Sequence, residues 1–202
     1  MLKTRNMDEN QKFWSEKYKS GETGWDVGRP TPPITEYFDQ LTSKTSKILI
    51  PGAGNAHEAA YLHDLGFQNL YVCDIAEEPL QEFAKQVPTF PQERLLCMDY
   101  FKLEATFDII IEQTFFCALP PTLRSAYIQK HHSLLATDGI LVGVLFDKKF
   151  AKEGPPFGGT KQEYIELMAP YFNIEIMSPC HNSIGPRLGS ELFIKLVKRD
   201  QE

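Results

Sequence analysis

The stretch Lys47-Ile48-Leu49-Ile50-Pro51-Gly52-Ala53-Gly54-Asn55-Ala56-His57-Glu58 decides the fold of this chain. An apolar run of strand length ends at two glycines, and a helical pattern follows. Gly52 and Gly54 let the backbone turn sharply and approach a ligand closely, because neither has a Cβ that would clash. The turn leads into a helix N-terminus, whose free N–H groups suit polar or anionic ligand atoms. The stretch therefore predicts a strand, a turn and a helix arranged around a ligand.

A carboxylate follows at the end of the next short strand. Asp74 lies about twenty residues beyond Gly54, where a Rossmann-type fold presents a carboxylate to the hydroxyls of a ribose. A glycine turn alone can also be a plain strand-to-helix connection, but the turn and the carboxylate together indicate a nucleoside cofactor. We place Gly52, Gly54, Asp74 and the adjacent Ile75 in the predicted cofactor site.

The residue at position 57 helps to distinguish between possible cofactors. A dinucleotide fingerprint has a third small residue there, so that helix and strand pack closely around a pyrophosphate. The chain has His57 instead. S-adenosylmethionine has no phosphate, so it needs the glycine turn and the carboxylate but not the third glycine. The pattern favours S-adenosylmethionine and ranks an NAD-dependent enzyme lower.

Composition and charge narrow the class further. The chain has 202 residues, 42% hydrophobic and 24% charged, which predicts one globular domain spanning residues 1–202. A net charge of −6 argues against a nucleic-acid partner, which requires clustered lysine and arginine. The four cysteines have no metal-ligand spacing, so we expect no metal. Without a signal-like or membrane-spanning apolar run, we expect a cytoplasmic monomer with no membrane contact.

Helical and strand patterns alternate along the chain. The predicted helices are 8–19, 34–41, 56–65, 79–86, 122–135 (with a stop signal at Asp138-Gly139) and 161–169. The predicted strands are 47–50, 69–73, 94–97, 107–111, 140–146, 173–177 and 191–198. The last two are too close in sequence for a helical crossover, so we expect an antiparallel pair at the sheet edge. The prediction is an α/β, Rossmann-like, doubly wound sheet of seven mostly parallel strands with an antiparallel last strand, as in class I methyltransferases.

Polar residues follow several of these strands. Ligands of a doubly wound sheet bind outside the carboxyl ends of its strands. There we expect the Asp99 carboxylate to accept from the adenine amino group and the Tyr100 ring to lie against the adenine. We expect Glu112 and Gln113 where the amino-acid end of the cofactor meets the methyl acceptor. Any one of them alone could be a loop residue or a helix cap.

Idiosyncratic segments along nearly the whole chain resemble a known family. They are Phe13-Trp14-x3-Tyr18, Thr23-Gly24-Trp25-Asp26, Ile50-Pro51-Gly52-Ala53-Gly54, the long run from Phe107-Asp108 to Leu123-Arg124, Gly154-Pro155-Pro156-Phe157 and Arg187-x-Gly189-x-Glu191. With these the chain resembles the thiopurine S-methyltransferase-like family, which includes thiol and halide methyltransferases. The resemblance implies S-adenosylmethionine as the methyl donor and a small soft nucleophile as the acceptor. It also implies cofactor contacts for Trp14, Tyr18, Trp25, Gly52, Asp74, Asp99, Tyr100 and Gln113.

The N-terminal aromatic residues suit a positively charged cofactor. Trp14 and Tyr18 are four residues apart and share a helix face, and Trp25 follows in the next loop. Aromatic faces attract cations such as a sulfonium. We therefore predict that residues 1–33 form a lid over the cofactor, hereafter the N-terminal lid. The alternative is that these rings only pack an N-terminal helix onto the domain.

The methyl acceptor is predicted from the remaining residues. A thiol is partly ionised near neutral pH, so a dedicated general base is optional. The candidate acceptor-site residues are Phe116, Phe146, Phe157, His181 and Arg187. Plant halide and thiol methyltransferases have a tyrosine at the position of Phe146, and the missing hydroxyl favours an apolar thiol over a halide. A selenium or tellurium species, and a non-catalytic S-adenosylmethionine-binding module, are the alternatives.

Overall fold

A seven-stranded mixed sheet forms the centre of the protein. The computed structural model describes residues 7–152 and 154–200. The strand order is β3-β2-β1-β4-β5-β7-β6, and β7 runs antiparallel to both β5 and β6. The strands are β1 (Lys47–Pro51), β2 (Asn69–Asp74), β3 (Leu95–Cys97), β4 (Phe107–Gln113), β5 (Leu135–Phe146), β6 (Phe172–Pro179) and β7 (Glu191–Lys198). The predicted fold class is confirmed, with β6 at the edge and β7 inside it.

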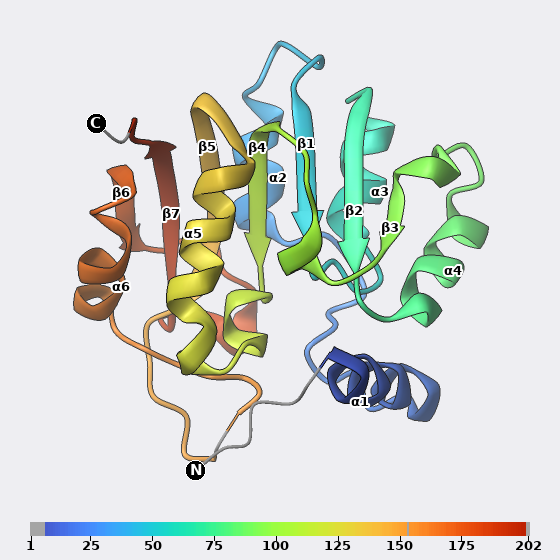
Figure 1. Cartoon of the computed structure of the whole chain (residues 1–202), viewed down its shortest axis with the longest axis horizontal. Helices are drawn as coiled ribbons and strands as arrows, with labels where there is room; N and C mark the ends of the chain where they lie inside the picture. The colour runs from blue at the N-terminus through green and yellow to red at the C-terminus, as the bar shows by residue number, and fades with distance from the viewer. Residues whose placement is uncertain (1–6, 153, 201–202) are drawn as a thin grey trace.

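Helices cover both faces of this sheet, and a further helix, α1, lies beyond the ends of its strands. The helices of the described residues are α1 (Met7–Ser20), α2 (Pro32–Asp39), α3 (His57–Asp64), α4 (Glu77–Gln86), α5 (Arg124–Leu134) and α6 (Lys161–Met168). Figure 1 shows α5 and α6 on the near face and α2 and α3 on the far face, with α1 beyond the carboxyl ends of β1 and β2. Within the described ranges, no helix is both long and apolar enough to cross a membrane.

Two hydrophobic clusters sandwich the sheet, and β1 contributes to both. Leu49 belongs to the cluster that includes Tyr127 and Ile128 of α5, whereas Ile48 and Ile50 belong to the cluster on the opposite face. Alternate residues of a strand point to opposite faces, so a strand covered on both sides is apolar at every position. This is why β1 reads as an uninterrupted apolar run that ends only at the glycine turn.

The predicted start of the fifth strand is wrong by five residues, because β5 begins at Leu135 and was expected to begin at Ile140. The helix expected over 122–135 comprises a short 3₁₀ turn at Pro121–Leu123 and α5, which ends at Leu134. Leu135 is already extended and pairs with Phe107 of β4. Asp138 has a positive φ of 56°, but it lies at an irregularity within β5 and caps no helix. Asp138 does adopt a conformation typical of turns, but pairing with β4 places it inside β5 and not at the end of a helix.

The position of α1 fits the predicted lid. Residues 1–6 of the N-terminal lid lie outside the described residues. The described part, α1 and the loop after it, lies at the carboxyl ends of the strands and away from both sheet faces (Figure 1). An ion pair of 2.9 Å joins Lys19 of α1 to Glu78 of α4. The lid thus sits next to the edge of the sheet where Gly54 and Asp74 lie.

Candidate cofactor and acceptor site

The turn between β1 and α3 requires both of its glycines. Gly52 and Gly54 have positive φ angles of 57° and 54°. A Cβ on Gly52 would lie 2.3 Å from Cδ2 of Phe115, and one on Gly54 would lie 2.6 Å from the Tyr18 hydroxyl. Both conformation and space therefore exclude a side chain here. The bare backbone is what a ligand lying on this turn would contact.

Asp74 ties this turn to the start of α4. Its carboxylate is 8% exposed and accepts the Gly54 N–H at Oδ2 (2.8 Å) and the Ala76 N–H at Oδ1 (2.9 Å). Burial raises the pKa of Asp74, while backbone N–H groups, including that of Ile75, act in the opposite direction. A carboxylate has about four acceptor positions, so lone pairs remain for ribose hydroxyls. The predicted ribose contact is compatible with this geometry.

The lid loop is bound to the glycine turn by a carboxylate that sequence reasoning missed. Asp26 accepts from the Asn55 side chain and from the Gly28 N–H (2.8 Å), and its Oδ1 lies 2.8 Å from Nε2 of His57. Burial acts to raise the pKa of Asp26, but these hydrogen bonds outweigh it and lower the pKa. His57, interpreted above only as a break in a dinucleotide pattern, thus holds the lid loop.

A second buried carboxylate anchors the far end of the same loop. Glu58, in the first turn of α3, accepts both the backbone N–H and the hydroxyl of Thr31 at Oε1, each at 3.0 Å. The lid loop is therefore attached to α3 at both ends. Neither contact could be predicted from spacing alone, because Thr31 and Glu58 are 27 residues apart.

The lid aromatics meet edge to face above the turn. The ring centroids of Trp14 and Trp25 are 5.4 Å apart, and those of Tyr18 and Trp25 are 5.8 Å apart. All three side chains are partly exposed. The structure thus brings together the three rings that the sequence placed in the lid, and Tyr18 reaches Gly54 itself.

One expectation about Asp99 and Tyr100, which lie just after β3, needs correction. Asp99 accepts the Phe101 N–H at 3.0 Å and caps a short 3₁₀ turn, Tyr100–Lys102. The Tyr100 side chain is only 5% exposed, hydrogen-bonds Nδ1 of His131 at 2.7 Å and packs on Phe115. The expectation that its ring lies against the adenine is therefore wrong. The turn capped by Asp99 directs the next side chain into the core, and only Asp99 stays at the partly exposed strand end.

The Glu112 carboxylate at the end of β4 is bound by the turn that follows this strand. Glu112 is 1% exposed, and its Oε1 accepts the N–H groups of Phe115 (2.8 Å) and Phe116 (2.9 Å). The Tyr127 hydroxyl donates to Oε2. Glu112 therefore holds the turn after β4, in which Thr114 has a φ of 62°. It anchors this turn, and the expectation that it lies where the amino-acid end of the cofactor meets the acceptor stays a prediction.

Gln113 remains suited to the cofactor. Its Oε1 is buried, and none of the described residues supplies a hydrogen bond to it. A buried acceptor without a donor is costly. A ligand that brings an N–H donor, such as the ammonium group of an amino acid, would satisfy it. Together with the bare glycine turn and the Asp74 carboxylate, this orphan oxygen fits S-adenosylmethionine.

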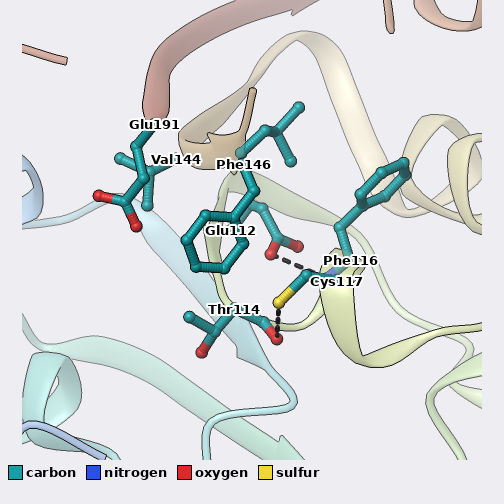
Figure 2. A pocket seen from close by; sticks show the side chains of 8 residues that line it. Glu112, Thr114, Phe116, Cys117, Val144, Phe146 and Glu191 are labelled. Carbon is teal, nitrogen blue, oxygen red and sulfur yellow. Dashed lines mark hydrogen bonds between the residues drawn. The ribbon is translucent and has the colours of Figure 1, made fainter. Parts of the chain in front are cut away.

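A small cavity lies at the ends of β4 and β5. It is lined by Glu112, Thr114, Phe116, Cys117, Val144, Leu145, Phe146 and Glu191. Its volume of about 10 Å³ is room for about one water molecule. Figure 2 shows the Glu112 carboxylate between the side chains of Phe146 and Phe116, with the Glu191 carboxylate on the other side of the Phe146 ring. The predicted acceptor residues Phe116 and Phe146 therefore share one apolar space with two carboxylates.

Arg187 connects this cavity to the lid. Its Nη2 donates to the Trp25 carbonyl at 2.7 Å, its Nη1 lies 3.7 Å from Oε1 of Glu191, and its Cζ lies 5.7 Å from the centroid of the Phe146 ring. The guanidinium is almost fully buried. A single side chain thus touches the lid backbone, the cavity carboxylate and the acceptor ring.

Two acceptor candidates lie elsewhere. The His181 side chain is 75% exposed and lies 3.3 Å from Glu36 of α2, outside the cavity, so the expectation that it faces the acceptor is wrong. Phe157 is not among the cavity-lining residues, and its N–H donates to the Cys117 carbonyl at 2.6 Å. Residues 7–152 and 154–200 contain no group of three or more His, Cys, Asp or Glu side chains that could hold a metal ion.

The sheet order, the glycine turn and the carboxylate at the end of β2 are those of the class I methyltransferase fold. The model of the thiopurine S-methyltransferase family matches residues 9–187, so the chain belongs to this family of S-adenosylmethionine-dependent methyltransferases. A probable thiol methyltransferase 2 of Arabidopsis thaliana is 29% identical over 93% of this chain and 85% of its own length.

Two further comparisons agree. Thiocyanate methyltransferase 1 of Brassica oleracea is 26% identical over 88% of this chain and 81% of its own length. The crystal structure of a Burkholderia thailandensis 1,6-didemethyltoxoflavin-N1-methyltransferase with bound S-adenosylhomocysteine superimposes with a TM-score of 0.76 at 19% identity, covering 94% of this chain and 87% of that one. At that identity the likeness supports the fold alone.

Proposed function

We propose that the protein transfers the methyl group of S-adenosylmethionine to the sulfur of a small apolar thiol. The observation that supports this most directly is the cavity at the ends of β4 and β5, in which aromatic rings surround a small space that also holds two carboxylates. The Arabidopsis relative named as a probable thiol methyltransferase points in the same direction.

The cofactor half of the site uses residues at the ends of β1, β2, β3 and β4. In this proposal Asp74 accepts the ribose hydroxyls, Asp99 accepts the adenine amino group, and Gln113 accepts the ammonium group. Trp14, Tyr18 and Trp25 cover the sulfonium with aromatic surface. When bound, S-adenosylmethionine supplies an electrophilic methyl group.

The acceptor half selects by solvation and charge. The partly exposed Phe146 ring offers apolar surface at the cavity, and a thiol whose hydrophobic body packs on this ring gains roughly 25 cal/mol for each Å² that it buries, whereas Phe116 is almost fully buried in the core. Glu112 and Glu191 would repel an anion in the same small space, whereas a thiol enters uncharged. Both effects favour a neutral apolar thiol over a halide.

Most of the rate acceleration in this proposal comes from positioning. In-line displacement needs three atoms aligned, and well-oriented intramolecular reactions reach effective molarities of about 10⁵ M or more. Arg187 bridges the Trp25 carbonyl of the lid to the Phe146 ring and Glu191 of the cavity. In this proposal Arg187 therefore couples closure of the lid to placement of the acceptor. The closed lid keeps water away from the cofactor and the acceptor.

A second candidate acceptor is a small anion such as thiocyanate. Nη1 of Arg187 is buried and has no hydrogen-bond partner among the described residues, which favours an anionic ligand. The Brassica relative is named a thiocyanate methyltransferase. Against this candidate stand the two cavity carboxylates, because Arg187 is already paired with Glu191 and no described cation acts on Glu112.

Incubation with methyl-labelled S-adenosylmethionine and a panel of acceptors tests the proposal. The panel contains aryl and alkyl thiols, iodide, thiocyanate, and selenium and tellurium oxyanions. We expect kcat/KM for the best thiol to exceed that for either anion by about tenfold or more, the scale of one well-buried apolar group. A preference for thiocyanate would establish the second candidate. Calorimetric binding of S-adenosylhomocysteine without turnover of any acceptor would indicate a non-catalytic binding module.

We further propose that the protein works as a cytoplasmic monomer on a small-molecule acceptor, without nucleic acid. The net charge of −6 supports the last point. Light scattering on the purified chain checks the monomer, and failure to shift a mixed DNA or RNA ladder at low salt checks the absence of nucleic-acid binding. Fluorescence microscopy of a tagged chain in its own cells, with even cytosolic signal expected, checks the location.

A further inference from the structure

Glu112 is a buried carboxylate whose hydrogen bonds come only from neutral donors. Two backbone N–H groups occupy Oε1, and one phenolic hydroxyl, that of Tyr127, donates to Oε2. Of about four acceptor positions on a carboxylate, three are used and one, on Oε2, remains. Glu112 also lines the acceptor cavity (Figure 2). The cavity has room for about one water molecule, so a thiol at its mouth reaches this carboxylate, which can still accept a proton, through that water.

The ionisable neighbours of Glu112 leave its negative charge poorly compensated. Tyr127 and Tyr100 lie on one side, and the pKa of each hydroxyl is raised, first by burial. Cys117 lines the cavity with it, and burial raises the pKa of that thiol too. Among the described cations, Arg187 lies 3.7 Å from Glu191 and is paired with that carboxylate, Lys148 also acts on Glu191, and Arg124 lies over the Phe116 ring, but none of them lowers the pKa of Glu112. Glu112 thus gains more from protonation than Glu191 does.

We propose that Glu112 is the general base that removes the proton from the thiol acceptor. The inference rests on the proposed thiol methyltransferase function. The S–H bond of the thiol breaks, and its proton goes through the cavity water to Oε2 of Glu112. An electron pair of the thiol sulfur forms the bond to the methyl carbon, and the pair of the old carbon–sulfur bond stays on the sulfur of S-adenosylhomocysteine. Glu112 returns the proton to solvent once the products leave.

The pKa of Glu112 suits a general base. Burial raises the pKa of Glu112 to about 7, although the Tyr127 hydroxyl and the two N–H groups act to lower it. A base whose pKa lies near the working pH combines a useful ionised fraction with a useful driving force for proton transfer. Glu112 is ionised above this pKa, so the reaction with a protonated thiol should become faster as the pH rises to about 7 and then level off.

Glu112→Gln tests the role with two acceptors of similar size. Benzyl mercaptan is almost wholly protonated at pH 7, and 4-nitrothiophenol is largely thiolate because of its electron-poor ring. An alkyl thiol is only a few per cent ionised at pH 7, so a variant limited to that fraction should lose about 10- to 30-fold in kcat/KM for benzyl mercaptan. For 4-nitrothiophenol, which has no proton to lose, we expect no loss, because removing the charge of Glu112 also removes a repulsion of the thiolate. Equal losses for both acceptors would overturn the base role and leave only the turn-anchoring role.

Glu191→Gln is the matched comparison, since Glu191 is the other carboxylate of the cavity. We expect it to raise kcat/KM for 4-nitrothiophenol, because it removes a charge that repels the thiolate, and to cause no selective loss with benzyl mercaptan. A selective loss with benzyl mercaptan in Glu191→Gln, absent from Glu112→Gln, would assign the base to Glu191 and contradict the proposal.

Tyr127→Phe gives a readout that does not depend on replacing Glu112. Removing the hydroxyl that donates to Oε2 takes away a bond that favours the ionised carboxylate. The pH at which kcat/KM for benzyl mercaptan levels off should therefore rise. Carbon-13 NMR of glutamate-labelled protein without cofactor should show one carboxyl signal that titrates near pH 7, moves upward in Tyr127→Phe and disappears in Glu112→Gln. If the signal that disappears in Glu112→Gln titrates below about pH 5, which is the ordinary glutamate range, the proposal is contradicted.

The outcomes separate the two proposals. If the unmodified protein methylates neither thiol, the proposed function fails and the base role fails with it. If it methylates both thiols and Glu112→Gln lowers both equally, the proposed function stands and only the base role is lost.

Discussion

The two halves of the site each contain a buried carboxylate at a strand end, and the two carboxylates are held differently. Asp74, at the end of β2, bonds backbone N–H groups from two different segments and lies beside the open glycine turn. Glu112, at the end of β4, bonds its own following turn and Tyr127 and lies beside aromatic rings. The first arrangement holds a polar ligand in place, and the second suits a group that changes its proton. The difference comes from the surroundings, since both side chains are carboxylates.

The largest expected effect comes from the cofactor half. Gly52→Ala should destabilise the protein by about 3 kcal/mol, since it combines a positive φ with a Cβ that overlaps Phe115. Gly66→Ala is the matched control, because Gly66 also has a positive φ of 86° but has nothing within 4 Å of the new Cβ. Urea unfolding of both variants is the measurement. Equal losses would show that conformation alone, without the Phe115 contact, determines the need for glycine.

Removing the carboxylate of the same half should weaken the cofactor. Asp74→Ala should reduce the affinity for S-adenosylhomocysteine by about 1.5–3 kcal/mol, the scale of hydrogen bonds to a charged group. Asp108→Ala is the control, because Asp108 also accepts a backbone N–H, that of Lys47 (2.7 Å), but at the opposite end of β1. Isothermal calorimetry on the two folded variants decides. Unchanged affinity in Asp74→Ala would remove Asp74 from the site.

The lid should respond to the cofactor through Asp26. Residues 7–28 should exchange amide hydrogens more slowly when S-adenosylhomocysteine binds, because the lid then packs on a ligand. Asp26→Ala removes the bonds to Asn55 and His57 and should abolish much of this protection, with a loss in affinity of about 0.5–1.5 kcal/mol for a net hydrogen bond. Lys12→Ala, which removes only an exposed pair with Glu16, is the control. Equal exchange with and without ligand would support the simple packing role of the aromatic residues.

The smallest effect concerns the acceptor half. Phe146→Tyr should shift the ratio of kcat/KM values toward iodide or hydrosulfide by a factor of about ten or less, since one hydroxyl adds one hydrogen bond to a small anion. The ring itself should stay in place, because Phe150 contacts it edge to face at 5.1 Å and Tyr164 holds the carbonyl of residue 146 at 2.7 Å. An unmodified protein that prefers iodide, or a ratio that the tyrosine leaves unchanged, would show that Phe146 does not set acceptor choice.

Local sequence patterns were sufficient to predict the strands, the helices and the glycine turn. Strand periodicity, the glycine turn and the distance from Gly54 to Asp74 are properties of short segments, and each predicted strand and helix is present. The aromatic spacing of Trp14 and Tyr18 likewise placed both rings next to Trp25. The boundary at Leu134 and Leu135 was missed because pairing with Phe107, 28 residues away, ends the helix.

Short segments of the chain therefore specify the sheet, the turn and the carboxylate beside it, since these depend on backbone conformation and on hydrophobic periodicity over a few residues. The roles of several side chains follow from tertiary packing. This packing turned Tyr100 into the core, left His181 at the surface, joined His57 to Asp26 and placed Glu112 against Tyr127. Each of these outcomes depends on where a distant segment packs, and the burial and charge that result set the acidity of a carboxyl group, which residue type alone does not specify.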